Sequence, residues 1–200
     1  QIASLHCNEF PPTAVIFDGI PRRPVRFFHG KGLMLVKSDM VIPPDIAPIL
    51  AEKIVEWAID KKIKEIIIFD GIPERNSDEE NKIWGVLSSH SAEEEAQELD
   101  VDVIQRGAIS GISSSLLLEA HENDLKAVGM FAEGTPKMPD PRASASLLRK
   151  FSKWKDIEID TESLIESAEQ LEEKYSQLVE QTKQAQEDMD KRSAHPPLYG

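Results

Sequence analysis

The sequence predicts an α/β sandwich with a mostly parallel sheet, followed by an acidic helix and an extended tail. Short apolar runs alternate with segments of helical spacing through residues 1–155, the pattern of strands and helices that pack in layers. The charge then changes, because residues 156–191 hold twelve acidic residues against three lysines, a net charge of −9 within a total of −13. We therefore divide the chain into an α/β core domain (1–155), an acidic helical arm (156–191) and a flexible tail (192–200).

Apolar runs of strand type and helical segments alternate within the core. The run at 66–69 is apolar on both faces, as expected of a central parallel strand. Together with the strand and helix before it, this run predicts a right-handed crossover unit. The predicted strands are 14–17, 33–36, 66–69, 101–104 and 125–131, and the predicted helices are 45–59, 113–121 and 143–154.

The pentapeptide Phe-Asp-Gly-Ile-Pro occurs twice, at 17–21 and at 69–73. Each copy follows an apolar run, so we expect each to form a turn at the carboxyl end of a strand, with glycine supplying unusual backbone angles. The two copies are either a duplicated ligand loop or two uses of one favourable turn. Five residues are too few to establish an internal repeat.

Composition excludes several classes of protein. No apolar run approaches the roughly 20 residues of a membrane span, so we expect no membrane insertion. The net charge of −13 argues against a nucleic-acid partner. The single cysteine, Cys7, fits a reducing cytoplasm and cannot build a multi-thiolate metal site alone. Nucleotide-binding and hydrolase motifs are absent and the histidines are scattered, so we expect no cofactor, no metal and no catalysis.

One loop could bind an anion. Residues 107–115 carry glycines and serines between a predicted strand and a predicted helix, where backbone N–H groups and hydroxyls can face a phosphate or carboxylate. The candidate residues are Gly107, Ser110, Gly111 and Ser113, with Ser114 and Ser115 beside them. The alternative is structural, because glycine lets a helix approach a sheet closely and serine caps helices.

Three acidic residues near predicted strand ends, Asp18, Asp70 and Glu74, form a second candidate group. Open α/β sheets place their sites at such ends, and paired carboxylates can act as acid and base or hold a metal. Asp before Gly is also ordinary turn chemistry. An enzyme or ligand-binding protein for a nucleoside-like or anionic ligand, with Asp18 or Asp70 as base, is therefore the alternative function.

The arm shows a heptad spacing of apolar residues. A helix from Asp160 to Lys191 would be about 48 Å long, and Asp160 or Thr161 could cap its start. The helix either packs on its own body or a sister subunit, or projects. The seam consists of Leu164, Ala168, Leu171, Tyr175, Leu178, Thr182, Ala185 and Met189.

The tail ends in a compact anchor, Leu198-Tyr199-Gly200. Leu198 can fill an apolar pocket, Tyr199 adds area and a hydroxyl, and a terminal carboxylate on Gly200 can pair with a lysine. The preceding Pro196-Pro197 stiffen the approach and lower the ordering cost of binding. A frayed end without function is the alternative.

The order of the motifs resembles the archaeal branch of the proteasome assembly chaperone family. The resemblance rests on Glu9-Phe10-Pro11-Pro12, the pentapeptide at 69–73, Gly107-Ala108-Ile109-Ser110-Gly111, Ala127-Val128-Gly129-Met130 and the acidic helical end. It implies a three-layer α/β sandwich similar to that of purine nucleoside phosphorylases, without known catalysis. The family normally begins with a further strand and helix carrying a Gly-Val-Gly-type turn, which we expect to be missing before Gln1.

The resemblance also implies a partner. In the family, a C-terminal hydrophobic-Tyr-X signature (HbYX) inserts between neighbouring α-subunits of the proteasome core particle, and its carboxylate meets a pocket lysine. Leu198, Tyr199 and Gly200 match that signature position by position. We therefore expect a homo-oligomer, a tetramer in preference to a pentamer, that binds the core particle and activates it or aids its assembly without ATP.

Overall fold

The computed structural model describes residues 2–4, 12–73, 81–89, 93–134, 140–167 and 170. The chain divides into two compact units. Unit 1 consists of Gln1–Phe69, Gly85–Gln97 and Asp102–Gly129, and unit 2 consists of Asp70–Trp84, Glu98–Val101 and Met130–Gly200.

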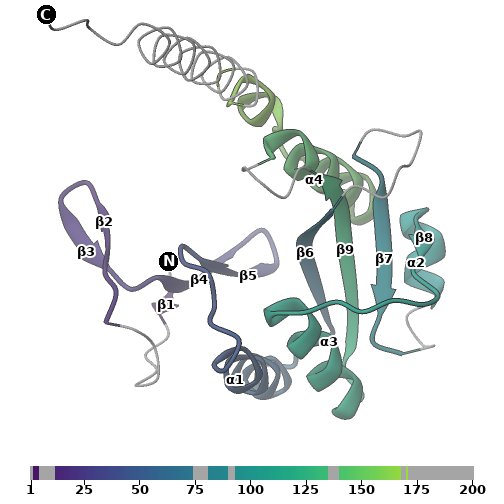
Figure 1. Cartoon of the computed structure of the whole chain (residues 1–200), viewed down its shortest axis with the longest axis horizontal. Coiled ribbons are helices and arrows are strands. Elements are labelled where there is room, and N and C mark those ends of the chain that lie inside the picture. The colour runs from purple at the N-terminus through teal and green to yellow at the C-terminus, as the bar shows by residue number, and fades with distance from the viewer. Residues whose placement is uncertain are drawn as a thin grey trace, which may run out of the picture. The chain divides into compact units, whose positions relative to one another are not determined.

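Unit 1 contains an antiparallel sheet with one face against a helix. Strands β1 (Ala3–Ser4), β4 (Val25–Gly30) and β5 (Leu33–Ser38) pair in the order β1-β4-β5. Figure 1 shows helix α1 (Ala47–Asp60) beside this sheet. The ring of Phe27 on β4 meets the ring of Trp57 on α1 edge-on, at 5.2 Å between centroids. The inner face of the sheet is therefore part of the core of unit 1.

Helices α1 and α3 (Ile112–Glu122) pack together in unit 1. Ile46, Leu50 and Ile54 form a buried cluster along α1 and its start. Residues from strand, loop and helix pack against this cluster, namely Val36, Ile42, Ile112 and Leu116. The predicted helical spacing at 45–59 and 113–121 is thus confirmed, because it marked the faces that these two helices bury.

The two copies of the pentapeptide adopt different structures. In the first copy, Asp18 and Gly19 have φ values of 51° and 75° and join β2 (Val15–Phe17) to β3 (Ile20–Arg22) in a two-residue hairpin, as glycine at this position allows. The second copy lies inside strand β6 (Glu65–Pro73), so the prediction of a second turn was wrong. The pairing of β6 in its sheet overrides the local preference of five residues.

A four-stranded sheet has the order β6-β9-β7-β8. Ser88 N–H donates to the Ala127 carbonyl (3.0 Å) and Glu133 N–H donates to the Lys82 carbonyl (2.8 Å), so β7 and β9 run antiparallel. The predicted α/β class, with a mostly parallel central sheet, is consistent with this fold, and the pair β7–β9 is an antiparallel exception. The further elements are β7 (Ile83–Leu87), α2 (Glu93–Leu99), β8 (Asp102–Val103) and β9 (Lys126–Gly134).

The predicted crossover unit at 33–69 was wrong. Strand β5 pairs antiparallel with β4 through a tight turn at Lys31 and Gly32, whereas β6 belongs to the four-stranded sheet. The helix between β5 and β6 therefore links two different sheets. Periodicity identified the three elements correctly, but it cannot identify the strand with which each one pairs.

Helix α4 (Pro141–Lys155) dominates the described part of unit 2. The carboxylate of Asp140 accepts a hydrogen bond from Ala143 N–H at 2.9 Å, and Pro141 occupies the first turn, so the helix has a regular N-cap. The helix ends at Asp156, which is left-handed with φ of 50°. This agrees with the predicted helix at 143–154.

The start of the arm is helical at 162–167. Asp160 accepts a hydrogen bond from Glu162 N–H at 2.9 Å, as expected for a residue that caps this segment. The rest of the heptad seam, and the tail, lie outside the described residues. The three-layer arrangement and the boundaries of the three predicted segments stay predictions.

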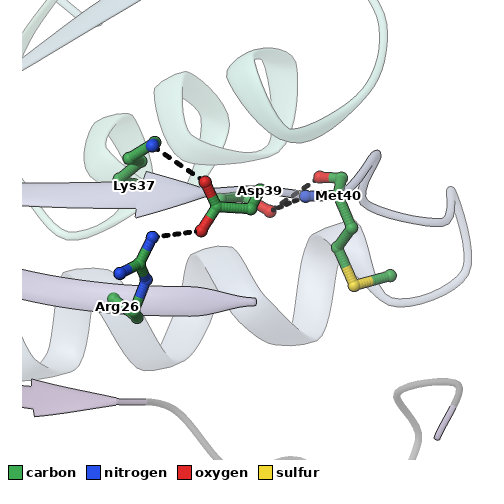
Figure 2. Close-up of polar contacts among 5 residues, drawn as sticks. Arg26, Lys37, Asp39 and Met40 are labelled. Carbon is green, nitrogen blue, oxygen red and sulfur yellow. Dashed lines mark hydrogen bonds and ion pairs between the residues drawn. The ribbon is translucent and has the colours of Figure 1, made fainter. Parts of the chain in front are cut away.

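Charged side chains join the start of β4 to the end of β5 (Figure 2). The side chain of Arg26 keeps only 9% of its accessible surface and forms an ion pair with Asp39, which also accepts from Lys37 Nζ at 2.8 Å. Hydrogen bonds from Lys37 and Arg26 hold the pKa of the Asp39 carboxyl below its usual range. The backbone N–H of Asp39 also donates to the Pro24 carbonyl, a second link between the residues before β4 and after β5.

We predict that Asp39→Asn destabilises unit 1 in a pH-dependent way. A lowered carboxyl pKa stabilises the fold above the unfolded pKa of about 3.9, and this stabilisation is lost as the pH falls through the folded pKa. The urea midpoint of the variant should therefore lie below that of the parent by a constant amount above about pH 5, and the gap should close below about pH 4. The exposed Asp45, replaced by Asn, is the control. A gap independent of pH would contradict the ionic role of Asp39.

We also predict that Asp140→Ala lowers the free energy of unfolding by about 1 kcal/mol, because it removes the N-cap of α4. Asp140→Asn should retain most of the stability, since its amide oxygen can accept the same hydrogen bond from Ala143. Chemical denaturation of the three proteins measures the difference. Equal losses in the two variants would show that the carboxylate acts through its charge and not as a cap.

Candidate functional site

The predicted docking residues Leu198, Tyr199 and Gly200 lie outside the described residues. Their role therefore stays a prediction that rests on sequence and resemblance. The other candidates, the loop at 107–115 and the acidic residues Asp18 and Asp70, lie within the described part of the chain.

The loop at 107–115 leads directly into α3. Gly111 is the N-cap of the helix with φ of 80° and ψ of −160°, a conformation that favours glycine. Gly107 and Ser110 are exposed, whereas Ser113 is buried and engaged in contacts within the protein. The sequence thus predicted the junction of loop and helix correctly. Gly111 is explained by its positive φ, which other residues rarely adopt.

The serine hydroxyls of this loop turn toward its own backbone. Ser114 Oγ donates to the Gly111 carbonyl at 2.8 Å, and Ser115 Oγ approaches the same oxygen at 3.3 Å. Hydroxyl donors used in this way are not directed at a ligand. Anion binding by Gly107, Ser110, Gly111 and Ser113 stays a prediction, with the exposed Gly107, Ser110 and Gly111 as the members that a ligand could reach.

The two described acidic candidates lie in different secondary structure, one in a turn and one in a strand. Asp18 is the first residue of the β2–β3 turn, where a left-handed aspartate is common. Asp70 lies within β6, and its carboxylate accepts a hydrogen bond from Gly71 N–H at 2.8 Å. Glu74 lies outside the described residues. Local backbone structure accounts for the described contacts of both aspartates, so a role as catalytic base stays a prediction.

Unit 1 holds an apolar cavity of about 360 Å³ that sequence reasoning did not predict. Residues from β4, β5, α1, β6 and α3 line it, among them Val36, Ile54, Ile68 and Leu116. Glu65 is the ionisable residue of the lining. The cavity can take an apolar group, but one carboxylate among aliphatic side chains does not form a catalytic constellation. Its lining comes from several separated segments, which explains why no local motif signals it.

A buried carboxylate in unit 2 was also missed. Glu133 on β9 is 2% exposed, and its Oε1 accepts a hydrogen bond from Trp84 Nε1 at 2.7 Å. Lys82 Nζ lies 4.5 Å from the centroid of the same indole ring. The run Met130–Gly134 signals a buried strand, but nothing local shows that a buried glutamate would find a partner 49 residues away.

His121 makes a hydrogen bond that joins two elements of the fold. His121 Nδ1 donates to the Ser88 carbonyl at 2.7 Å, which joins α3 to the end of β7. Within the described ranges, no group of three or more His, Cys, Asp and Glu side chains could hold a metal ion. The same ranges contain no helix long and apolar enough to cross a membrane.

Comparison with known proteins shows relatives along nearly the whole chain. The model of the PAC2 family matches residues 1–179. An uncharacterized protein of Methanocaldococcus jannaschii, MJ0106, is 31% identical over 188 residues, which cover 94% of this chain and 76% of that protein. The sequence relationship thus includes the core and the greater part of the acidic arm, while the tail lies beyond the family match.

Solved structures with the same fold include two from Pyrococcus furiosus. PbaA, an archaeal homolog of proteasome-assembly chaperone, has a TM-score of 0.81 and 27% identity over 94% of this chain and 79% of its own. PbaB, an archaeal proteasome activator, has a TM-score of 0.73 and 20% identity over 86% and 78%. The resemblance seen in the sequence motifs is thereby confirmed, and the chain belongs to the PAC2 family.

Proposed function

We propose that this chain is a cytoplasmic, non-catalytic protein that binds the α-subunit ring of the proteasome core particle and activates it or aids its assembly without ATP. The likeness to PbaA over 94% of the chain carries the proposal. The likeness to PbaB agrees with it at the level of the fold. Homologues named for proteasome assembly and activation make the core particle the partner to test first.

The tail supplies the chemistry for docking. Leu198 and Tyr199 offer an aliphatic and an aromatic side chain, and a carboxylate on Gly200 would pair with a lysine between two α-subunits. From Arg192 the chain can extend about 30 Å, so a tip can reach a pocket while its body stays outside. Binding energy at the ring, and not nucleotide hydrolysis, would then shift the core particle toward its open or assembled state.

Several tails acting together would strengthen a weak contact. A single tripeptide buries little surface and dissociates quickly, but a homo-oligomer presents one tail per subunit. Each bound tail raises the effective concentration of the next. A tetramer is the oligomer we favour, with a pentamer as the alternative.

We predict that removal of the last three residues abolishes the interaction. Full-length chain and a version ending at Pro197 are compared for stimulation of peptide hydrolysis by purified archaeal core particles and for binding by native gel. Tyr199→Ala should weaken binding by roughly 30-fold, the effect of losing an anchor worth about 2 kcal/mol. Tyr199→Phe, which keeps the ring and loses the hydroxyl, should fall between the parent and the alanine variant.

The two readouts separate activation from assembly. Tail-dependent binding with stimulated hydrolysis indicates an activator, and tail-dependent binding without stimulation indicates an assembly role. Binding that is equally strong without residues 198–200 would contradict docking through the tail. No binding by any version would contradict the proteasome as partner.

A further inference from the structure

The outer face of the β4–β5 sheet is apolar where an antiparallel sheet normally meets water. Residues opposite each other in the ladder share a face, which pairs Phe28 with Leu35 and Gly30 with Leu33 on the side away from α1. Leu35 is 55% exposed and Leu33 is 37% exposed. Polar residues are expected at such positions, so this patch of large apolar side chains indicates an interaction surface.

Basic residues border this patch. Arg26 lies opposite Lys37 on the same face of the ladder, and its guanidinium lies 5.5 Å from the centre of the Phe28 ring. The side chain of Lys37 is 54% exposed. We call the residues Arg26, Phe28, Leu33, Leu35 and Lys37 the outer surface.

The segment of the chain that carries the outer surface is basic. Residues 12–44 carry five basic and two acidic residues, a net charge of +3 in a chain of −13. Two outer surfaces packed against each other would bring like charges together, which is unfavourable. An apolar partner with acidic flanks complements the surface. The arm of this chain has that composition, with a net charge of −9 over residues 156–191.

We propose that the outer surface binds the acidic heptad segment, residues 160–179, of a second copy of this chain. The seam residues Leu164, Leu171 and Leu178 would cover Leu33 and Leu35, and the glutamates beside the seam would face the exposed Lys37. Covering a sheet face with an amphipathic helix is a standard way to bury both apolar surfaces.

The dimensions of the two elements agree. The seam from Leu164 to Leu178 would extend about 21 Å as a helix, and the six residues of β5 span about 20 Å. Each copy gives one arm and accepts one arm, so two copies can exchange arms as a two-fold pair, or head-to-tail contacts can close into a ring. The inference deepens the proposed function, because it names the contact that would hold the tail-bearing subunits together.

Photo-crosslinking of the full chain tests the occupant directly. Leu35 is replaced by p-benzoylphenylalanine, and unlabelled chains are mixed with isotope-labelled chains, unfolded and refolded together before irradiation. Mass spectrometry should find crosslinks from position 35 to residues 160–179, about half of them joining a light chain to a heavy chain. The same probe at Ile59, an exposed apolar residue of α1 (46% exposed), is the control and should not capture the arm.

Every other outcome overturns the proposal in a defined way. Crosslinks to the arm that never join light to heavy chains place the arm on its own body. Crosslinks to other residues identify a different occupant, and a probe that captures nothing shows that the surface is open. The version ending at Pro197 should crosslink as the parent does, so failure here is distinguishable from failure of proteasome docking.

A pair of substitutions tests the charge argument. Leu35→Glu and Leu35→Lys remove the same apolar side chain, but only Glu repels the acidic arm. We expect the dissociation constant of the oligomer to rise at least tenfold more for Leu35→Glu than for Leu35→Lys, measured by analytical ultracentrifugation at low salt. Ile59→Glu should leave it unchanged. Equal effects of Glu and Lys at position 35 would contradict charge complementarity.

Discussion

A guanidinium that is largely removed from water must have a carboxylate close to it, and Asp39 meets this need for Arg26. The pair holds the start of β4 to the chain that leaves β5. Because strand residues alternate between faces, fixing Arg26 on the outer face fixes Val25 and Phe27 on the inner face. Phe27 then meets Trp57, and the helix that carries Trp57 packs on α3. The arrangement of unit 1 thus depends on one ionic corner.

The same corner gives the sheet its two different faces. The inner face presents Val25, Phe27 and Val36 toward α1, and these residues are buried or half-buried. The outer face keeps Phe28, Leu33 and Leu35 beside cationic side chains, which costs solvation free energy unless something covers them. A body with an uncovered apolar and basic surface, linked to an acidic seam, has the composition of a subunit that completes its fold by assembly. Multivalent presentation of tails would follow from that assembly.

Local sequence predicted α1, α3 and α4 well, but it missed helix α2 and strand β7 and predicted the pairing of strands poorly. The spacing of Ile46, Leu50 and Ile54 marks the buried face of α1 directly, and Gly111 followed by serines marks the start of α3. Strand β4 was missed because Arg26 and His29 interrupt its apolar pattern, and Arg26 is tolerated only through Asp39, thirteen residues later. The crossover of β5 and β6 was wrong for the same reason, since pairing is decided by distant segments. The cavity and the buried Glu133 likewise depend on contacts that no single window of sequence contains.

Docking through the tail is the central claim, and competition by a peptide tests it most directly. A synthetic peptide of residues 192–200 is titrated into a complex of the full chain and the proteasome core particle, beside a peptide of the same composition with Leu198 and Tyr199 moved from the end. We predict that the first peptide displaces the full chain and the second does not. Displacement by both peptides or by neither, with the complex itself formed, would contradict the claim that the last three residues are the anchor.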